Sequence, residues 1–250
     1  MRLSVCMPIF FEGLPIHEAI READKLGFDA VEMWKMTDID FEETKKALDE
    51  TGVEFVAICT DYPKLTAEAD LAPYLEGVKT ACEKAKKLGI KRLISQVGYD
   101  TGEPREIQCA RIVNGLKKAA EILEEYDITI IVEPLNTLVN HRGYFLWSSV
   151  EAFDILREVN HPLIKLCYDI YHQQVMEGNI LANVLGNLDL IGHLHSAGCP
   201  GRHELQFGEN DYKRIFEEVE KAGYTGSCAL EYFPLLDPIE SLKEAKRIYG

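Results

Sequence analysis

Short apolar runs alternate with longer amphipathic segments along the whole 250-residue chain. Residues 129–132 form a continuous, largely β-branched run, as expected for a strand that is buried on both faces. Residues 104–126 instead repeat apolar side chains every three or four positions, as at Ile112, Leu116 and Leu123, which predicts a helix. Eight such units in 250 residues favour a closed (β/α)₈ TIM barrel, class α/β, over a doubly wound sheet.

The predicted elements follow one another without a linker or a low-complexity stretch, so we expect one domain, residues 1–250. Strands are predicted near 2–8, 29–34, 54–59, 91–96, 128–133, 164–168, 190–195 and 227–231. Helices are predicted near 14–26, 41–51, 70–88, 104–126, 149–160, 179–187, 209–222 and 238–249. Several of these helices end just before a glycine, as at Gly52 and Gly89, which is a common helix C-terminus.

The composition limits the classes of partner. The net charge of −15 argues against nucleic acids and anionic membranes as partners. No run approaches the length of a membrane span, and the N-terminus lacks the pattern of a signal peptide. The seven cysteines form no CxxC pair, so we expect buried, reduced thiols and a cytoplasmic location. The sequence leaves homo-oligomerisation open.

Four side chains that can bind a metal lie near the ends of four successive predicted strands. They are Glu133, Asp169, His195 and Glu231. Active-site residues of such barrels lie at the C-terminal ends of the strands, so we expect these side chains to share one pocket. Without a cation, the repulsion and desolvation of several buried acids would be costly. Three carboxylates and one imidazole suit Mn²⁺, Mg²⁺ or Zn²⁺, and we expect one such ion.

Neighbouring residues are candidates for substrate contact. His172 follows Asp169 by three positions and is expected to point from a loop toward the same pocket. Arg202 lies in the long predicted loop 196–208, and its planar guanidinium suits a carboxylate or a polyol. His193 shares a strand face with His195 and is either a core residue or a support for the metal site; the sequence does not choose between these readings.

These residues resemble the xylose isomerase-like barrel superfamily, particularly its hydroxypyruvate isomerase-like and tagatose 3-epimerase-like branches. The matching segments are Glu133-Pro134-Leu135-Asn136, Tyr168-Asp169-Ile170-Tyr171-His172, Ile191-Gly192-His193-Leu194-His195 with Arg202, Gly208-Glu209 with Asp211-Tyr212, and Leu230-Glu231-Tyr232. The match covers roughly residues 128–232, and the first half matches only as barrel units.

The resemblance implies a set of roles. The four predicted metal-binding residues would hold one divalent ion, and Glu133 and Glu231 would also move protons. His172 and Arg202 would contact the substrate, and Asn136 would contact either the substrate or a metal ligand. The implied reaction is the isomerisation of a small sugar or keto acid through an enediolate, with proton transfer by carboxylates.

Departures from the family pattern leave the substrate open. His195 is typical of the epimerase branch, where hydroxypyruvate isomerases can carry Gln, whereas Val139 replaces an acid that epimerases often have. We expect a hydroxypyruvate isomerase-like enzyme whose substrate carboxylate pairs with Arg202. The alternatives are a ketose 3-epimerase, an inosose-type polyol dehydratase and a non-catalytic sugar-binding barrel. A metal-dependent phosphodiesterase is disfavoured because the chain is acidic and offers one ligand set.

Overall fold

Eight parallel strands close into one barrel in the computed structural model, which describes residues 1–35, 37, 39–60 and 65–250. The strands are β1 (Arg2–Cys6), β2 (Ala30–Met33), β3 (Glu54–Cys59), β4 (Arg92–Ser95), β5 (Thr129–Val132), β6 (Ile164–Asp169), β7 (Ile191–Ser196) and β8 (Ser227–Leu230). They follow chain order around the barrel, and β1 pairs with both β2 and β8. The predicted (β/α)₈ fold is confirmed.

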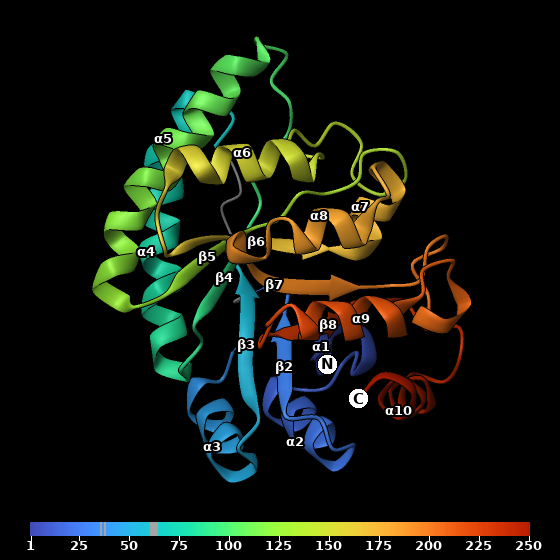
Figure 1. Cartoon of the computed structure of the whole chain (residues 1–250). Coiled ribbons are helices and arrows are strands. Elements are labelled where there is room, and N and C mark those ends of the chain that lie inside the picture. The colour runs from blue at the N-terminus through green and yellow to red at the C-terminus, as the bar shows by residue number, and fades with distance from the viewer. Residues whose placement is uncertain (36, 38, 61–64) are drawn as a thin grey trace.

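Helices surround the barrel on its outer side (Figure 1). They are α1 (Met7–Phe10), α2 (Ile16–Lys25), α3 (Phe41–Thr51), α4 (Leu71–Leu88), α5 (Arg105–Tyr126), α6 (Ser149–Val159), α7 (Ile170–Met176), α8 (Ile180–Leu185), α9 (Tyr212–Lys221) and α10 (Pro238–Tyr249). Short 3₁₀ turns occupy Glu68–Asp70, Leu188–Leu190 and Leu205–Phe207. Among the described residues, none of the helices combines the length and the apolar character needed to cross a membrane.

The core divides into a large layer between strands and helices and a small cluster inside the barrel. On α5, the periodic apolar residues Ile112, Leu116 and Leu123 are all fully buried in the outer layer. On β5, Ile130 belongs to the outer layer and Ile131 to the interior cluster, since successive strand residues point to opposite faces. The periodic apolar residues of α5 and the continuous apolar run of β5 therefore both pack at the wall of the barrel.

Two short helices occupy positions that the sequence assigned differently. The predicted strand 2–8 ends at Cys6, and α1 begins at Met7, with Pro8 in its first turn, where a missing backbone N–H costs nothing. Residues 170–172 were predicted as loop but begin α7. Asp169 caps this helix, because its Oδ1 accepts a hydrogen bond of 3.0 Å from the backbone N–H of His172. His172 therefore lies on a helix, which fixes its direction.

Tyr144 fixes the ends of β4 and β5 where the chain leaves the barrel. Its hydroxyl accepts a hydrogen bond of 2.8 Å from the backbone N–H of Val97 and donates one of 3.0 Å to the carbonyl of Glu133. Tyr144 comes from the long segment between β5 and α6. The backbone of Glu133 is thus held by the segment that follows it.

Glu204 fixes the segment after β7 to the segment after β8. Its buried carboxylate accepts hydrogen bonds of 3.0 Å from the backbone N–H groups of Leu235 and Leu236, and of 3.0 Å from the hydroxyl of Ser241. Burial alone would raise the pKa of Glu204, but these donors outweigh it and lower the pKa below its ordinary value. The folded protein therefore stabilises the ionised form of the Glu204 side chain.

We predict that Glu204→Gln lowers the free energy of unfolding at pH 7 by about 1–3 kcal/mol, because the amide group turns a donor toward backbone donors. A pKa that is lower in the folded state gives stability that is present above the ordinary Glu value and is lost as pH falls. In denaturant unfolding, the difference in the free energy of unfolding between wild type and Glu204→Gln should therefore become smaller below about pH 4. The exposed Glu217→Gln is the matched control; a pH-independent difference would contradict the prediction.

Candidate metal centre and substrate cavity

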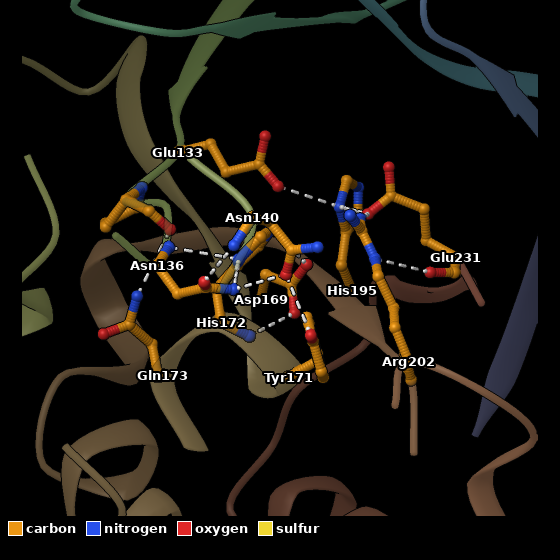
Figure 2. A network of polar contacts seen from close by, with 12 residues as sticks. Glu133, Asn136, Asn140, Asp169, Tyr171, His172, Gln173, His195, Arg202 and Glu231 are labelled. Atoms are coloured by element: carbon orange, nitrogen blue, oxygen red, sulfur yellow. Dashed lines mark hydrogen bonds and ion pairs between the residues drawn. The ribbon is translucent and has the colours of Figure 1, made fainter. Parts of the chain in front are cut away.

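The four predicted metal-binding residues converge at the C-terminal end of the barrel (Figure 2). Glu133 and Glu231 directly follow β5 and β8, whereas Asp169 and His195 lie within β6 and β7. One donor atom from each residue lies within 4.8 Å of the others, and all four residues are buried. The structure therefore brings together the residues that the sequence placed at four strand ends.

The cluster fits a divalent cation. His195 Nδ1 lies 3.1 Å from Glu133 Oε1 and 3.4 Å from Glu231 Oε2, yet neither ring nitrogen forms a well-aligned hydrogen bond within the described residues. Burial raises the pKa of Glu133 and of Asp169, because desolvation penalises their charged forms. A cation would offset that cost, and this set of oxygen and nitrogen donors suits Mn²⁺, Mg²⁺ or Zn²⁺.

Glu231 also has partners outside the four-residue cluster. Its Oε1 accepts a hydrogen bond of 2.6 Å from Trp34 Nε1, and its Oε2 lies 2.5 Å from Arg202 Nη2. Burial pushes the pKa of Glu231 upward, but the charges of Arg202 and His195 and the close contact with His195 together outweigh it and hold the pKa well below its ordinary value. Glu231 therefore ionises more readily than an ordinary glutamate, whereas burial makes ionisation of Glu133 and Asp169 less favourable than usual.

Arg202 is held rigidly beside this cluster. Its guanidinium carbon lies 5.5 Å from the ring centre of Tyr171 and 5.8 Å from that of Phe233, within reach of both rings for a cation–π interaction. Its backbone carbonyl accepts a hydrogen bond of 2.8 Å from the N–H of Phe233. The residue adopts a left-handed backbone conformation, with φ of 58°. The loop therefore aims the charge of Arg202 into the site.

His172 is neutral and has a defined tautomer. Burial and the nearby charge of Arg202 lower its pKa to about 3. Its Nδ1 lies 3.1 Å from the backbone N–H and 2.7 Å from the side-chain Nδ2 of Asn136 (Figure 2). Because both of these groups are donors, Nδ1 is the acceptor and Nε2 carries the proton. Asn136 is fully buried and contacts His172, which lines the cavity.

A cavity of about 380 Å³ opens above the cluster, which is an ordinary size for a small-molecule site. Its wall includes Glu133, His172, His195, Arg202 and Glu231 from the second half of the chain. It also includes residues at or just beyond the ends of strands β2 to β4, which the sequence did not single out for the site: Trp34, Lys35, Cys59, Thr60 and Gln96. Their place at predicted strand ends was the signal that could have found them.

Glu32 is a buried acid that the sequence analysis also missed. It belongs to β2, is 1% exposed, and lies 2.8 Å from His193 Nε2 and 3.2 Å from His195 Nε2. Burial would raise its pKa, but His195 and the hydrogen bond from His193 lower the pKa to about 2. His193, which the sequence left undecided, therefore contacts an acid that also contacts a predicted metal ligand.

Residues 20–248 match the family model of the xylose isomerase-like TIM barrel. The chain belongs to this family. A hydroxypyruvate isomerase of Escherichia coli (strain K12) is 30% identical over 243 residues, which cover 94% of each chain. A 2-oxo-tetronate isomerase of Haemophilus influenzae is 27% identical over 251 residues and 96% of each chain. A solved structure described as an AP endonuclease, family 2, from Brucella melitensis has a TM-score of 0.93 at 25% identity, with coverage of 100% of this chain and 99% of that chain.

We predict that Mn²⁺ stabilises the protein and that Asp169→Asn removes this effect. At about one hundred times its dissociation constant, a bound ion adds roughly 2.7 kcal/mol, which raises Tm by about 5–10 °C in a chain of this size. Differential scanning calorimetry with and without Mn²⁺ measures the shift. Asp154→Asn, at a side chain 71% exposed, should retain the full shift. An equal shift in Asp169→Asn would remove Asp169 from the ligand set.

Proposed function

We propose that this protein is a divalent-metal-dependent isomerase of small α-hydroxy carbonyl compounds, with short keto acids of the hydroxypyruvate type as the favoured substrates. One observation carries the proposal: three members of the four-donor cluster, Glu133, His195 and Glu231, line a cavity that also presents an arginine and a neutral histidine donor. The names of the E. coli and H. influenzae relatives support the same class of reaction.

Glu133, Asp169, His195 and Glu231 would hold the ion. When bound, the ion supplies Lewis-acid stabilisation for the negative charge that develops on an enediolate. The carboxylates limit the net charge of the loaded site, and the imidazole adds a neutral donor. All four come from strands or strand ends, so their positions depend on the barrel rather than on mobile loops.

Glu133 and Glu231 would carry out the proton transfers. One carboxylate takes the proton from the carbon that bears the hydroxyl group, and a proton then returns to the former carbonyl carbon. The hydroxyl proton moves to the former carbonyl oxygen, so the product is an isomer and no other reactant is consumed. The two glutamates have different surroundings, since burial raises the pKa of Glu133 while Arg202 lowers that of Glu231. Carboxylates with separated pKa values suit the two roles of acid and base.

His172 and Arg202 would orient the substrate. The Nε2–H group of His172 lies on the cavity wall, 3.5 Å from Asp169 Oδ2 and without a well-aligned hydrogen bond among the described residues, so it could donate to a substrate oxygen. Arg202 offers a planar fork to a substrate carboxylate. A phosphodiesterase reading has less support, because all three groupings of metal-binding side chains within the described residues share His195, and the chain carries a net charge of −15.

We predict that Glu231→Gln keeps the fold and lowers turnover by roughly 10²–10⁴-fold, the usual contribution of a positioned acid or base. Conversion of hydroxypyruvate is measured together with the metal content of each preparation, since loss of the ion would lower the rate by another route. Glu217→Gln is the matched surface control. A fully metal-loaded Glu231→Gln enzyme with the wild-type rate would exclude Glu231 from the chemistry.

We predict that Arg202→Lys impairs conversion of a keto acid at least roughly tenfold more than conversion of a neutral ketohexose. Lysine keeps the positive charge but cannot form the two parallel hydrogen bonds of a guanidinium with a carboxylate. The ratio of kcat/KM on hydroxypyruvate and on a ketohexose measures the difference, with the exposed Arg157→Lys as control. Equal losses on both substrates, or activity on ketohexoses alone, would favour a ketose 3-epimerase.

A further inference from the structure

Glu32 links two histidines inside the barrel. Its Oε2 lies 2.8 Å from His193 Nε2, and its Oε1 lies 3.2 Å from His195 Nε2. All three side chains are at most 1% exposed. Strands β2 and β7 are not neighbours in the barrel, since β1 and β8 lie between them. The link therefore crosses the barrel interior and joins the two halves of the chain.

The hydrogen-bonding chemistry of this link determines which nitrogen of His195 is free. A carboxylate only accepts hydrogen bonds, so an imidazole nitrogen that bonds to it must carry a proton. A proton on Nε2 of His195 would face Glu32, 3.2 Å away, although this contact is not a well-aligned hydrogen bond. With an ion beside Glu133 and Glu231, the neutral ring would keep that proton on Nε2 and leave the lone pair on Nδ1 for the ion. Nδ1 is the atom that faces Glu133 and Glu231, at 3.1 Å and 3.4 Å.

We propose that Glu32 is a positioning residue that fixes the tautomer and the direction of His195 as a metal ligand, and that His193 holds Glu32 in place. The proposal rests on the metal site of the proposed function. A carboxylate behind a ligating histidine orients the ring and strengthens its donor atom. Here the carboxylate comes from a strand of the first half that supplies none of the proposed ligands.

The surroundings argue against a purely structural role for Glu32. The interior of the barrel also contains an apolar cluster, whose buried members are Ala30, Val56, Ala57, Ile94, Ile131 and Cys167. A buried charge is costly to desolvate, and an apolar side chain of similar volume is often as stable or more stable in such a place. Within the described residues, His193 Nδ1 has no hydrogen-bond partner, so the polar contacts of this ring converge on Glu32. A role in directing His195 explains why the charge lies there.

Glu32→Gln tests the proposal because it keeps the volume and removes the charge. The amide has one oxygen and one NH₂ group, so it cannot accept hydrogen bonds from both histidines in their present form. We expect the Kd for Mn²⁺, measured by isothermal titration calorimetry, to rise about 10–100-fold relative to wild type. Tyr74→Phe is the matched control, because it removes another fully buried hydrogen bond, the 2.9 Å contact with Ser95, away from the cluster. Its Kd should stay at the wild-type value.

A spectroscopic measurement separates orientation of the ligand from general damage. In zinc-loaded, ¹⁵N-histidine-labelled wild type, the Nε2–H proton of His195 should resonate downfield, as a proton bound to a carboxylate does, and Glu32→Gln should lose this signal. If Glu32→Gln does not fold, Glu32→Asp replaces it, because its shorter side chain keeps the charge but cannot reach both histidines; it too should weaken Mn²⁺ binding.

The outcomes are distinct. Wild-type affinity and an unchanged Nε2–H signal in the folded Glu32 variant would overturn the role of Glu32 and leave the proposed function standing. A wild-type protein that binds no Mn²⁺ or Zn²⁺ would overturn the proposed function, and the role of Glu32 with it. Weaker binding in Tyr74→Phe as well as in Glu32→Gln would assign the loss to stability and would also overturn the proposal.

Discussion

Repulsion between buried carboxylates is the physical constraint that shapes the C-terminal end of this barrel. Four acids lie there, each at most 6% exposed: Glu32, Glu133, Asp169 and Glu231. Isolated charges in such a place would cost several kcal/mol each, so each carboxylate needs a cation or hydrogen-bond donors. Arg202 and Trp34 stabilise Glu231, and two histidines contact Glu32. Glu133 and Asp169 have fewer partners to offset the cost of their desolvation. A divalent ion would therefore stabilise these two carboxylates most.

The fold and the central cluster could be predicted from the sequence for a clear reason. Strands that are buried on both faces form continuous apolar runs, and barrel helices show a strong three-to-four-residue period, as on α5. Once the strand ends are known, closure of the barrel brings them to one face, so Glu133, Asp169, His195 and Glu231 had to lie near one another. Their positions close to these strand ends also indicated His172 and Arg202, both of which line the cavity.

What the sequence did not reveal depends on contacts between distant segments. Glu32 stands in an apolar strand, but its partners are 161 and 163 positions away in the chain, and no local pattern connects them. The bond from Trp34 to Glu231 also joins the two ends of the sequence. Helix α7 was missed because Asp169 was interpreted only as a ligand, whereas it also caps the helix that carries His172.

The link between β2 and β7 has a consequence for how this barrel can be divided. A fragment that begins at β5 would contain all four proposed metal ligands. It would lack both Glu32 and Trp34, however, which contact His195 and Glu231 from the first half of the chain. Joining two copies of that half would replace β2, and with it Glu32 and Trp34, by a second β6. The site therefore depends on two unlike halves, because the second half carries the proposed ligands and the first half carries groups that contact two of them.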